Sequence, residues 1–265
     1  MPTSVSLCVA VLGLGEAGTA IAAGLRDAGA VVRGYDPVAG APDGVDAQPT
    51  AAEAVTGAAV VLSVNSATAA APVLRAGRDG AVAGTVWADL NTSAPELKRR
   101  LAAECDEAGL LFADVALLAP VPGKGLATPA LASGPGAARY AELLCPLGAV
   151  VDVLDGPPGL AATRKLLRSV FLKGIAAALI EALSAARAAG CEDWLRANIV
   201  AELTAADART VERLETGTYR HAGRRIDEVT ATVELLDGLG VPARISAATR
   251  DWLAALATST TGRTP

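Results

Sequence analysis

Residues 9–18 read Val-Ala-Val-Leu-Gly-Leu-Gly-Glu-Ala-Gly, and a Gly-Tyr-Asp segment follows at 34–36. The apolar run from Val5 to Leu12 is typical of a buried strand, residues 16–28 favour a helix, and residues 31–35 favour a second strand. A G-x-G-x-x-G turn that joins a strand to a helix in this way is typical of a dinucleotide-binding βαβ unit. The alternative is an ordinary βαβ turn, in which the glycines only permit a tight connection.

Each glycine of this turn has a distinct expected role. Gly13 permits the tight turn, Gly15 lets the backbone approach a pyrophosphate, and Gly18 lets the helix pack on the strand. The first-turn amides and the positive end of the helix dipole face the phosphates. Asp36 follows Gly18 at close to the ~20 residues expected of the acid that binds a ribose 2′-hydroxyl. The predicted cofactor contacts here are Gly13, Leu14, Gly15, Glu16, Ala17, Gly18 and Asp36.

Composition excludes several classes of protein. The chain has 265 residues and a net charge of −5, which argues against a nucleic-acid partner because such a partner favours a basic surface. It has one histidine and four scattered cysteines without a C-x-x-C motif, so no metal site is expected. No signal peptide is evident at the start. The longest apolar segment, 170–190, contains three charged residues, so no membrane span is expected. These features predict a cytoplasmic protein with reduced cysteines.

Strand and helix signals alternate over the first ~155 residues, which predicts a doubly wound parallel sheet. Beyond the break at Asp155-Gly156-Pro157-Pro158-Gly159 every convincing segment is helical. We therefore predict a Rossmann NAD(P)-binding domain over 1–156 and an all-helical substrate and dimerisation domain over 157–265, with a disordered tail at 258–265. The expected strands are 5–12, 31–35, 59–64, 85–89, 110–115, 129–133 and 150–154. The expected helices are 16–28, a short one from 51, 95–108, 137–144, 160–189, 194–203, 205–214, 226–239 and 246–257.

Polar residues follow the third and fourth expected strands, at Asn65-Ser66 and Asn91-Thr92-Ser93. Ligands of open α/β sheets bind at the carboxyl ends of the strands, so these residues and the 114–125 segment after the fifth strand are expected to surround one crevice. There they would hydrogen-bond a nicotinamide ribose or a substrate carboxylate. The alternative is that they only close turns and cap helices. For Ser93 we favour a capping box with Glu96; for Asn91 both interpretations stay open.

A candidate proton-transfer group lies on the long helix after the break. Lys165, Ser169 and Lys173 recur every fourth residue and therefore share one face. A buried lysine, whose pKa is lowered by desolvation, can exchange a proton with the oxygen of a carbon that gains or loses a hydride. The alternative is a solvated stripe on an amphipathic helix.

Taken together, these segments resemble the β-hydroxyacid dehydrogenase family, which includes 6-phosphogluconate dehydrogenase and 3-hydroxyisobutyrate dehydrogenase. The resemblance is carried by the turn at 13–18, by Asp89-Leu90-Asn91-Thr92, and by Gly156 and Gly159 before Lys165. A narrower resemblance, to a bacterial subgroup with its own helical C-terminal domain, covers 114–135, 165–181 and 220–241. The resemblance to the β-hydroxyacid dehydrogenase family implies that Lys165 is the catalytic acid or base, assisted by Asn91 and by Ser169, which stands at the family's asparagine.

The chain departs from the family pattern around the substrate. Leu117, Leu118 and Ala119 replace the family's Val-Ser-Gly, and its C-terminal Lys-Asp pair aligns near Asp227-Glu228. Arginines and a histidine between 220 and 225 are a candidate replacement that would suit an anionic substrate; the alternative is an ordinary solvated helix start. The predicted substrate contacts are Thr92, Val121, Pro122, Gly123, Lys173, His221 and Arg225.

The resemblance implies an NAD(P)-dependent oxidoreductase that interconverts a carbonyl and an alcohol on a small acidic metabolite, and a homodimer formed through the helical domain. Asp36 favours NAD over NADP, because its carboxylate would repel a 2′-phosphate. Two alternatives stay open. One is an imine reductase, which shares this architecture but does not need a lysine in this role. The other is a non-catalytic NAD(P)-binding sensor.

Overall fold

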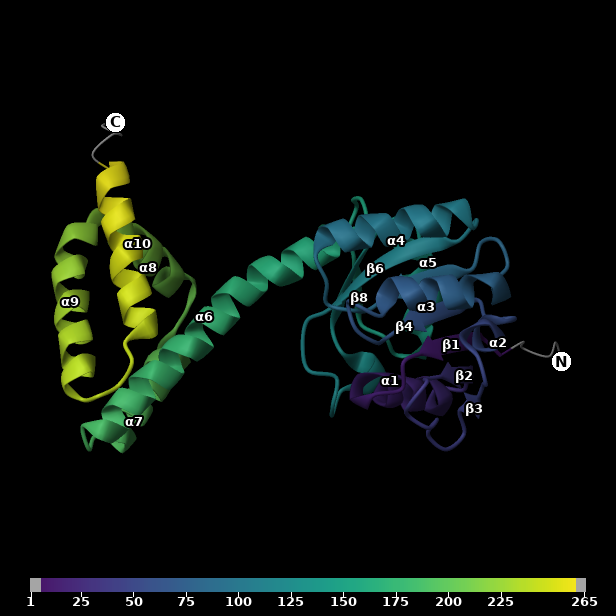
Figure 1. Ribbon diagram of the computed structural model, residues 1–265, viewed down its shortest axis with the longest axis horizontal. Helices are drawn as coiled ribbons and strands as arrows, with labels where there is room; N and C mark the ends of the chain where they lie inside the picture. The colour runs from purple at the N-terminus through teal and green to yellow at the C-terminus, as the bar shows by residue number, and fades with distance from the viewer. Residues whose placement is uncertain (1–5, 261–265) are drawn as a thin grey trace. The chain divides into compact units, whose positions relative to one another are not determined.

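The computed structural model of the chain describes residues 6–260 (Figure 1). Val5 and residues 261–265 of the expected tail lie outside them. The chain forms two compact units that divide between Arg168 and Ser169, inside helix α6 (Leu160–Ala188). The domain boundary at 156/157 stays a prediction; the first turns of α6 belong to the first compact unit.

The first unit contains an eight-stranded sheet in the order β3-β2-β1-β4-β5-β6-β7-β8. The strands are β1 (Cys8–Leu12), β2 (Val31–Tyr35), β3 (Asp46–Ala47), β4 (Val60–Ser63), β5 (Val86–Asp89), β6 (Leu111–Leu117), β7 (Ala130–Ser133) and β8 (Val151–Val153). The helices are α1 (Glu16–Asp27), α2 (Ala51–Val55), α3 (Ala70–Gly77), α4 (Pro95–Glu107) and α5 (Ala137–Leu144). The predicted Rossmann fold class is confirmed.

One strand pairing departs from the predicted all-parallel sheet. β7 runs antiparallel to β6, with Asp114 opposite Ser133 and Leu117 opposite Ala130, while β8 is parallel to β7. Between β6 and β7 the described chain forms only a 3₁₀ turn (Gly125–Ala127). Antiparallel neighbours need no crossover helix, so this connection is sufficient. The chain therefore leaves β8 at the edge opposite to the carboxyl ends of the parallel strands.

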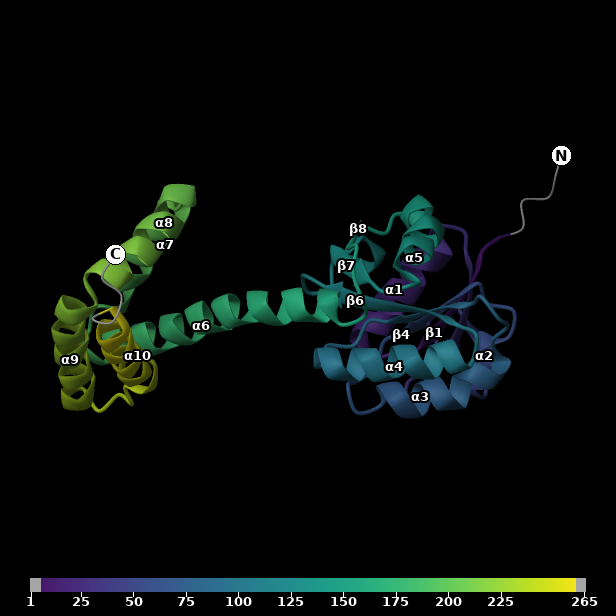
Figure 2. The same cartoon turned by 90° about the horizontal axis from the view of Figure 1, so that it is seen from above.

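Helices cover both faces of this sheet. Helices α1 and α5 lie on one face, and α2, α3 and α4 on the other (Figures 1 and 2). Val9 and Val11 of β1 pack with Ile21 and Leu25 of α1. On the other face, the core includes Leu12, Val61, Leu74, Trp87, Leu101 and Phe112. Because both faces are covered, the central strands are buried throughout, which explains their continuous apolar runs.

Two local predictions, one about the N-cap residue of α4 and one about the end of β6, are wrong. Pro95 occupies the first helical position, so Ala94 is the N-cap residue and Ser93 lies one residue too early to cap the helix. Asp114 does not begin a loop; it lies inside β6, because pairing with β7 extends this strand to Leu117.

The second unit is helical. After the greater part of α6 it contains α7 (Glu192–Ala205), α8 (Ala208–Arg220), α9 (Ala222–Gly238) and α10 (Arg244–Thr260). Residues 258–260 of the expected disordered tail are thus helical. The predicted start of α8 was too early, because Asp207 and Thr210 form a reciprocal capping box that fixes it.

Glu181 of α6 joins two helices within the second unit. Its carboxylate accepts hydrogen bonds from the backbone amides of Ile245 and Ser246, at 2.7 and 2.8 Å, and from the Ser246 hydroxyl at 2.7 Å. The start of α10 is therefore capped by a side chain from another helix. No helix between residues 6 and 260 combines the length and apolar character needed to cross a bilayer.

Candidate active site

The glycine turn between β1 and α1 has the shape that a dinucleotide requires. Gly13 has φ +103°, and a Cβ on it would lie 2.2 Å from the Val64 carbonyl oxygen. A Cβ on Gly18 would lie 1.9 Å from the Gly13 oxygen, so the close packing of turn and helix excludes larger residues at both positions. At Gly15, by contrast, a Cβ would meet nothing within 4 Å. The turn thus leaves open space in front of the first-turn amides of α1, where a pyrophosphate fits.

Asp36 follows the end of β2 and binds the glycine turn. Its Oδ2 accepts a hydrogen bond from the Leu14 amide at 2.8 Å, and its Oδ1 accepts from the amides of Val38 and Ala39 at 2.8 and 2.9 Å. Burial alone would raise the pKa of this carboxyl group, but the three amide hydrogen bonds outweigh burial and lower the pKa below its ordinary value. Asp36 is therefore a carboxylate at neutral pH.

Arg33 is the cation nearest in sequence to Asp36, and its guanidinium is engaged elsewhere. It donates to the Gln48 Oε1 at 2.9 Å and to the Thr56 carbonyl oxygen, and lies 3.7 Å from the Asp46 carboxylate. These partners belong to the segment from β3 to α2. Arg33 is thus held by the outer edge of the sheet.

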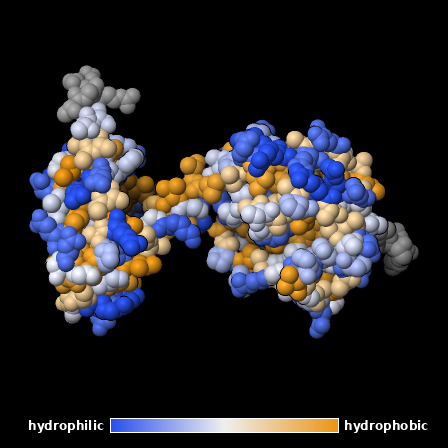
Figure 3. Space-filling view, in the orientation of Figure 1, coloured by the Kyte–Doolittle hydropathy of each residue, from blue (hydrophilic) through white to orange (hydrophobic). Residues whose placement is uncertain are grey.

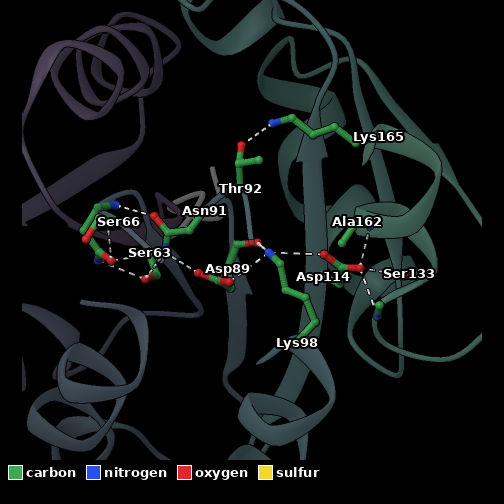
Figure 4. A network of polar contacts seen from close by, with 12 residues as sticks. Ser63, Ser66, Asp89, Asn91, Thr92, Lys98, Asp114, Ser133, Ala162 and Lys165 are labelled. Carbon is green, nitrogen blue, oxygen red and sulfur yellow. Dashed lines mark hydrogen bonds and ion pairs between the residues drawn. The ribbon is translucent and has the colours of Figure 1, made fainter. Parts of the chain in front are cut away.

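A cluster of amide side chains connects the carboxyl ends of β4 and β5 (Figure 4). Asn91 is buried; its Oδ1 accepts a hydrogen bond from the Asn65 amide at 2.7 Å, and its Nδ2 faces Ser63 Oγ, Asn65 Oδ1 and Asp89 Oδ1. The Asn65 side chain in turn accepts from the Ser66 amide at 3.0 Å. These contacts are the ones expected if Asn91 only closes the turn after β5. They leave one lone pair on Asn91 Oδ1 for another donor.

Lys165 lies at the same edge of the sheet. Its Nζ donates to the Thr92 hydroxyl at 2.7 Å, which joins α6 to the end of β5 (Figure 4). Lys165 and Thr92 pack beside Asn91, Ser93 and Lys98 without leaving room for a water molecule. Burial lowers the pKa of Lys165, the charge of Lys98 lowers it further, and Asp114 opposes both. The result is a lysine that releases its proton more readily than an exposed one.

Next to Lys165 and Thr92 lies an ion cluster that was not predicted. Lys98 of α4 is 1% exposed, and its Nζ lies 2.8 Å from Asp89 Oδ2 and 3.2 Å from Asp114 Oδ1. It also donates to the Asp89 carbonyl oxygen at 2.8 Å. The sequence carries a signal for it: Lys98 shares the buried stripe of α4 with Leu101 and Cys105, and a lysine at an apolar position of such a stripe is rarely buried without partners.

The residues predicted near the substrate in the first unit differ in accessibility. Thr92, Pro122 and Gly123 are exposed, whereas Val121 is buried in the core. Ser93 is also buried, and its hydroxyl has no hydrogen-bond partner among residues 6–260. Because Val121 packs into the core, any contact from it to a substrate would come from its backbone.

The remaining predicted site residues belong to the second unit. Ser169 is half-buried and Lys173 is exposed, both on α6. His221 is exposed at the junction of α8 and α9, and Arg225 donates to the Thr218 hydroxyl at 2.5 Å. Arg225 lines a hollow of about 390 Å³ between α8, α9 and α10, together with Arg224 and Trp252.

Within residues 6–260, no group of three or more histidine, cysteine, aspartate and glutamate side chains is arranged to hold a metal ion. The sheet topology and the glycine turn together define the class of the protein: it has an NAD(P)-binding fold like that of the hydroxyacid dehydrogenases.

Comparison with known families agrees with this class. Residues 8–138 match the NAD binding domain of 6-phosphogluconate dehydrogenase, and residues 186–256 match a domain of unknown function, DUF1932. A conserved hypothetical protein from Sinorhizobium meliloti 1021, known from its crystal structure, is 30% identical over 95% of this chain and 89% of that chain, with a TM-score of 0.61. The chain belongs to the 6-phosphogluconate dehydrogenase-like family, in the form in which the NAD-binding domain is followed by this helical domain.

Other solved structures share the fold. The imine reductase of Streptomyces aurantiacus is 25% identical over 95% of both chains, with a TM-score of 0.82. A reductive aminase from Aspergillus terreus, in complex with NADPH and ethyl levulinate, is 17% identical over 96% of this chain and 95% of that chain, with a TM-score of 0.80. None of the curated proteins matches the chain significantly. The matched family and these two enzymes are oxidoreductases.

Proposed function

We propose that this protein is an NAD-dependent oxidoreductase that interconverts a carbonyl and an alcohol on a small acidic metabolite in the cytoplasm. The observation that carries the proposal is the position of Lys165. Its amine lies 2.7 Å from the Thr92 hydroxyl, at the end of β5 and next to Asn91. This is the edge of the sheet at which the ligands of such folds bind.

In the proposed mechanism, Lys165 moves the proton that accompanies hydride transfer. Its neutral amine accepts the proton from an alcohol oxygen, and its ammonium returns a proton to a carbonyl oxygen in the reverse direction. The lowered pKa of Lys165 makes its proton easier to release. The nicotinamide ring, when bound, supplies or accepts the hydride.

The cofactor would be held by the glycine turn and the neighbouring strand ends. Residues 13–18 would hold the pyrophosphate, and Asp36 would bind the adenine ribose. The nicotinamide half would be contacted by Asn65, Ser66 and Asn91. A carboxylate at Asp36, with Arg33 engaged elsewhere, supports NAD over NADP.

Substrate contacts are proposed on both units. In the first unit these are Thr92, the 121–123 segment and Asn91, which has one lone pair free. In the second unit, Ser169 would assist Lys165, and Lys173, His221 and Arg225 would bind the acidic group of the substrate. Cationic side chains suit a carboxylate or phosphate.

An imine reductase is the second candidate, because the S. aurantiacus enzyme is similar over nearly its whole length. Against it stands Lys165, for which imine reduction has no need in this role. A panel of hydroxyacids, sugar acids, aldehydes and imines, each tested with NAD(H) and NADP(H) at the nicotinamide absorbance, separates the two reactions. If only imines are turned over, the protein is an imine reductase and the proposed reaction is wrong. If no compound of the panel is turned over, the result favours a non-catalytic NAD(P)-binding sensor.

Replacing Lys165 tests the mechanism on whichever panel member is turned over. In Lys165→Met we expect turnover to fall by about 100-fold or more, the contribution typical of a positioned acid or base, with NADH affinity nearly unchanged. Arg99→Met is the matched control, since it removes an exposed cation that pairs with Glu96 on its own helix. If turnover survives in Lys165→Met, the proposed mechanism is wrong.

A further inference from the structure

Lys98 is an unusual residue to find in the interior of this chain. The sequence has only four lysines, at 98, 124, 165 and 173. Of these, Lys98 is almost completely buried. Desolvating an ammonium costs several kcal/mol, and an apolar side chain would fill the same position on α4 without that cost. Packing alone therefore does not explain a lysine here.

The two carboxylates that Lys98 joins lead to opposite sides of the candidate site. Asp89 accepts a hydrogen bond from Asn91, which in turn holds the Asn65 amide. Asp114 Oδ2 accepts from the amides of Gly159 and Ala162, both at 3.0 Å. Ser133, which donates to Asp114 at 3.3 Å, accepts from the Ala161 amide at 3.1 Å. One carboxylate thus fixes the end of β5, and the other fixes the first turn of α6 (Figure 4).

Lys165 follows this first turn directly and reaches back to Thr92, beside Asn91. Without a cation between them, Asp89 and Asp114 would be two buried like charges on adjacent strands, opposite each other in the β5–β6 register, and would repel. The ammonium of Lys98 lets both strand ends carry a carboxylate, and each carboxylate orders its own segment.

We propose that Lys98 is a positioning residue for the reaction: by joining Asp89 to Asp114, it holds the Asn91 segment and the start of α6 together, so that Lys165 meets the end of β5 in a single arrangement. This inference rests on the proposed role of Lys165, and it adds a residue that does not itself touch the substrate.

Electrostatics give the same residue a second effect. The charged groups that act on Lys165 are Lys98, from α4, and Asp114, from β6. Lys98 itself is faced by Asp89 and Asp114. Removal of the Lys98 charge leaves Asp114 as the charged neighbour, so the pKa of Lys165 should rise.

The test measures the reactivity of Lys165 without any substrate. Wild-type protein and variants are labelled with a trace of acetic anhydride across a pH series, and each lysine is quantified by mass spectrometry, with Lys173 as the internal reference. The variants are Lys98→Met and the pair Lys98→Met with Asp89→Asn, which keeps the net charge of the ion cluster unchanged. Arg99→Met, one residue along α4 but exposed, is the matched control. NADH titration and circular dichroism report whether each variant is folded.

We expect both Lys98 variants to shift the labelling profile of Lys165 to higher pH, with several-fold slower labelling at neutral pH, while Arg99→Met reproduces the wild-type profile. A lysine that only stabilises the fold would lower the unfolding midpoint and leave this profile in place, which would overturn the proposal. Failure of the charge-balanced double variant to fold would overturn it too, because Lys98 would then be a requirement of the fold itself. The labelling experiment does not measure turnover. A failure of the proposed enzymatic function would therefore appear separately, in the turnover measured for Lys165→Met.

Discussion

At the scale of single residues, Asp36 serves both the fold and the proposed cofactor site. Its carboxylate accepts three backbone hydrogen bonds, one from the glycine turn and two from the segment after β2. Hydrogen bonds to a charged group are worth about 1.5–3 kcal/mol each, so this carboxylate orders the turn before any ligand binds. The remaining lone pairs are available to a ribose hydroxyl.

Asp36→Asn should therefore weaken NADH binding and reduce the preference for NADH over NADPH. We expect the Kd for NADH to rise about tenfold or more, since losing one charged hydrogen bond costs about 1.5–3 kcal/mol. Fluorescence titration with both dinucleotides measures the ratio. Asp43→Asn, at an exposed position on the same segment, should leave both constants unchanged. An unaltered ratio in Asp36→Asn would contradict the assignment of Asp36 to the ribose.

The roles of single residues could be predicted from the sequence only in part. The glycines of the turn could be recognised from their spacing, and the structure gives two of them a reason: Gly13 has φ +103°, and Gly18 has no room for a Cβ. The capping role predicted for Ser93 was wrong because an N-cap residue must directly precede the helix, and with Pro95 as the first helical residue that position belongs to Ala94. Lys98 was missed because its partners lie on β5 and β6, and only the tertiary fold brings them to α4.

At the scale of elements, prediction succeeded best where a glycine or proline stands near each end of the segment. The ranges of β2 and α5 agree with the structure, and α6 differs by one residue at its end. Helix α3 was missed, since its sequence AAPVLRAG has a proline inside it; Pro72 is tolerated because it occupies the first turn. Strand β3 has two residues, both exposed, and leaves no periodic pattern to detect.

The cap that Glu181 provides to α10 makes a prediction at this scale. Glu181→Ala should lower the free energy of unfolding of the helical unit by about 0.5–2 kcal/mol, the usual cost of losing a side-chain cap. Urea denaturation followed by circular dichroism measures the difference. Glu202→Ala, at an exposed position on α7, should change stability by less than about 0.5 kcal/mol.

The same cap should depend on pH. Burial raises the pKa of Glu181, but the hydrogen bonds from Ile245, Ser246 and Arg244 outweigh burial and lower it. A carboxyl group whose pKa is lower in the folded state contributes stability that is fully present above its ordinary pKa and is lost as the pH falls through the lowered one. The stability difference between wild type and Glu181→Ala should therefore shrink on acidification; a constant difference would contradict the capping role.

At the scale of the whole molecule, apolar side chains remain on the surface of the described chain. Val170, Phe171, Ile180 and Trp194 are each more than 60% exposed, and the apolar residues of α6 form an orange band in Figure 3. Monomeric soluble proteins rarely leave large apolar patches uncovered, and such patches usually mark a protein interface. This supports the homodimer through the helical unit that the family resemblance predicts.

A homodimer should have twice the chain mass in solution, measurable by light scattering or native mass spectrometry at micromolar concentration. Phe171→Asp should shift the population to the monomer, because a carboxylate in an apolar interface is costly to desolvate. Val82→Asp makes the same change at an exposed position of the first unit and should leave the mass unaltered. A monomeric wild-type protein would contradict the predicted dimer.

The reversal of direction at β7 limits how the sequence can vary in length. Since β7 and β8 run opposite to β6, α6 starts at Asp114 and carries Lys165 toward the carboxyl end of β5. The number of residues between Gly159 and Lys165 therefore sets both the distance and the direction in which Lys165 points from the helix. One residue inserted into it would turn Lys165 by about 100° and advance it by about 1.5 Å. Such an insertion would carry the amine away from Thr92 without replacing any side chain of the site.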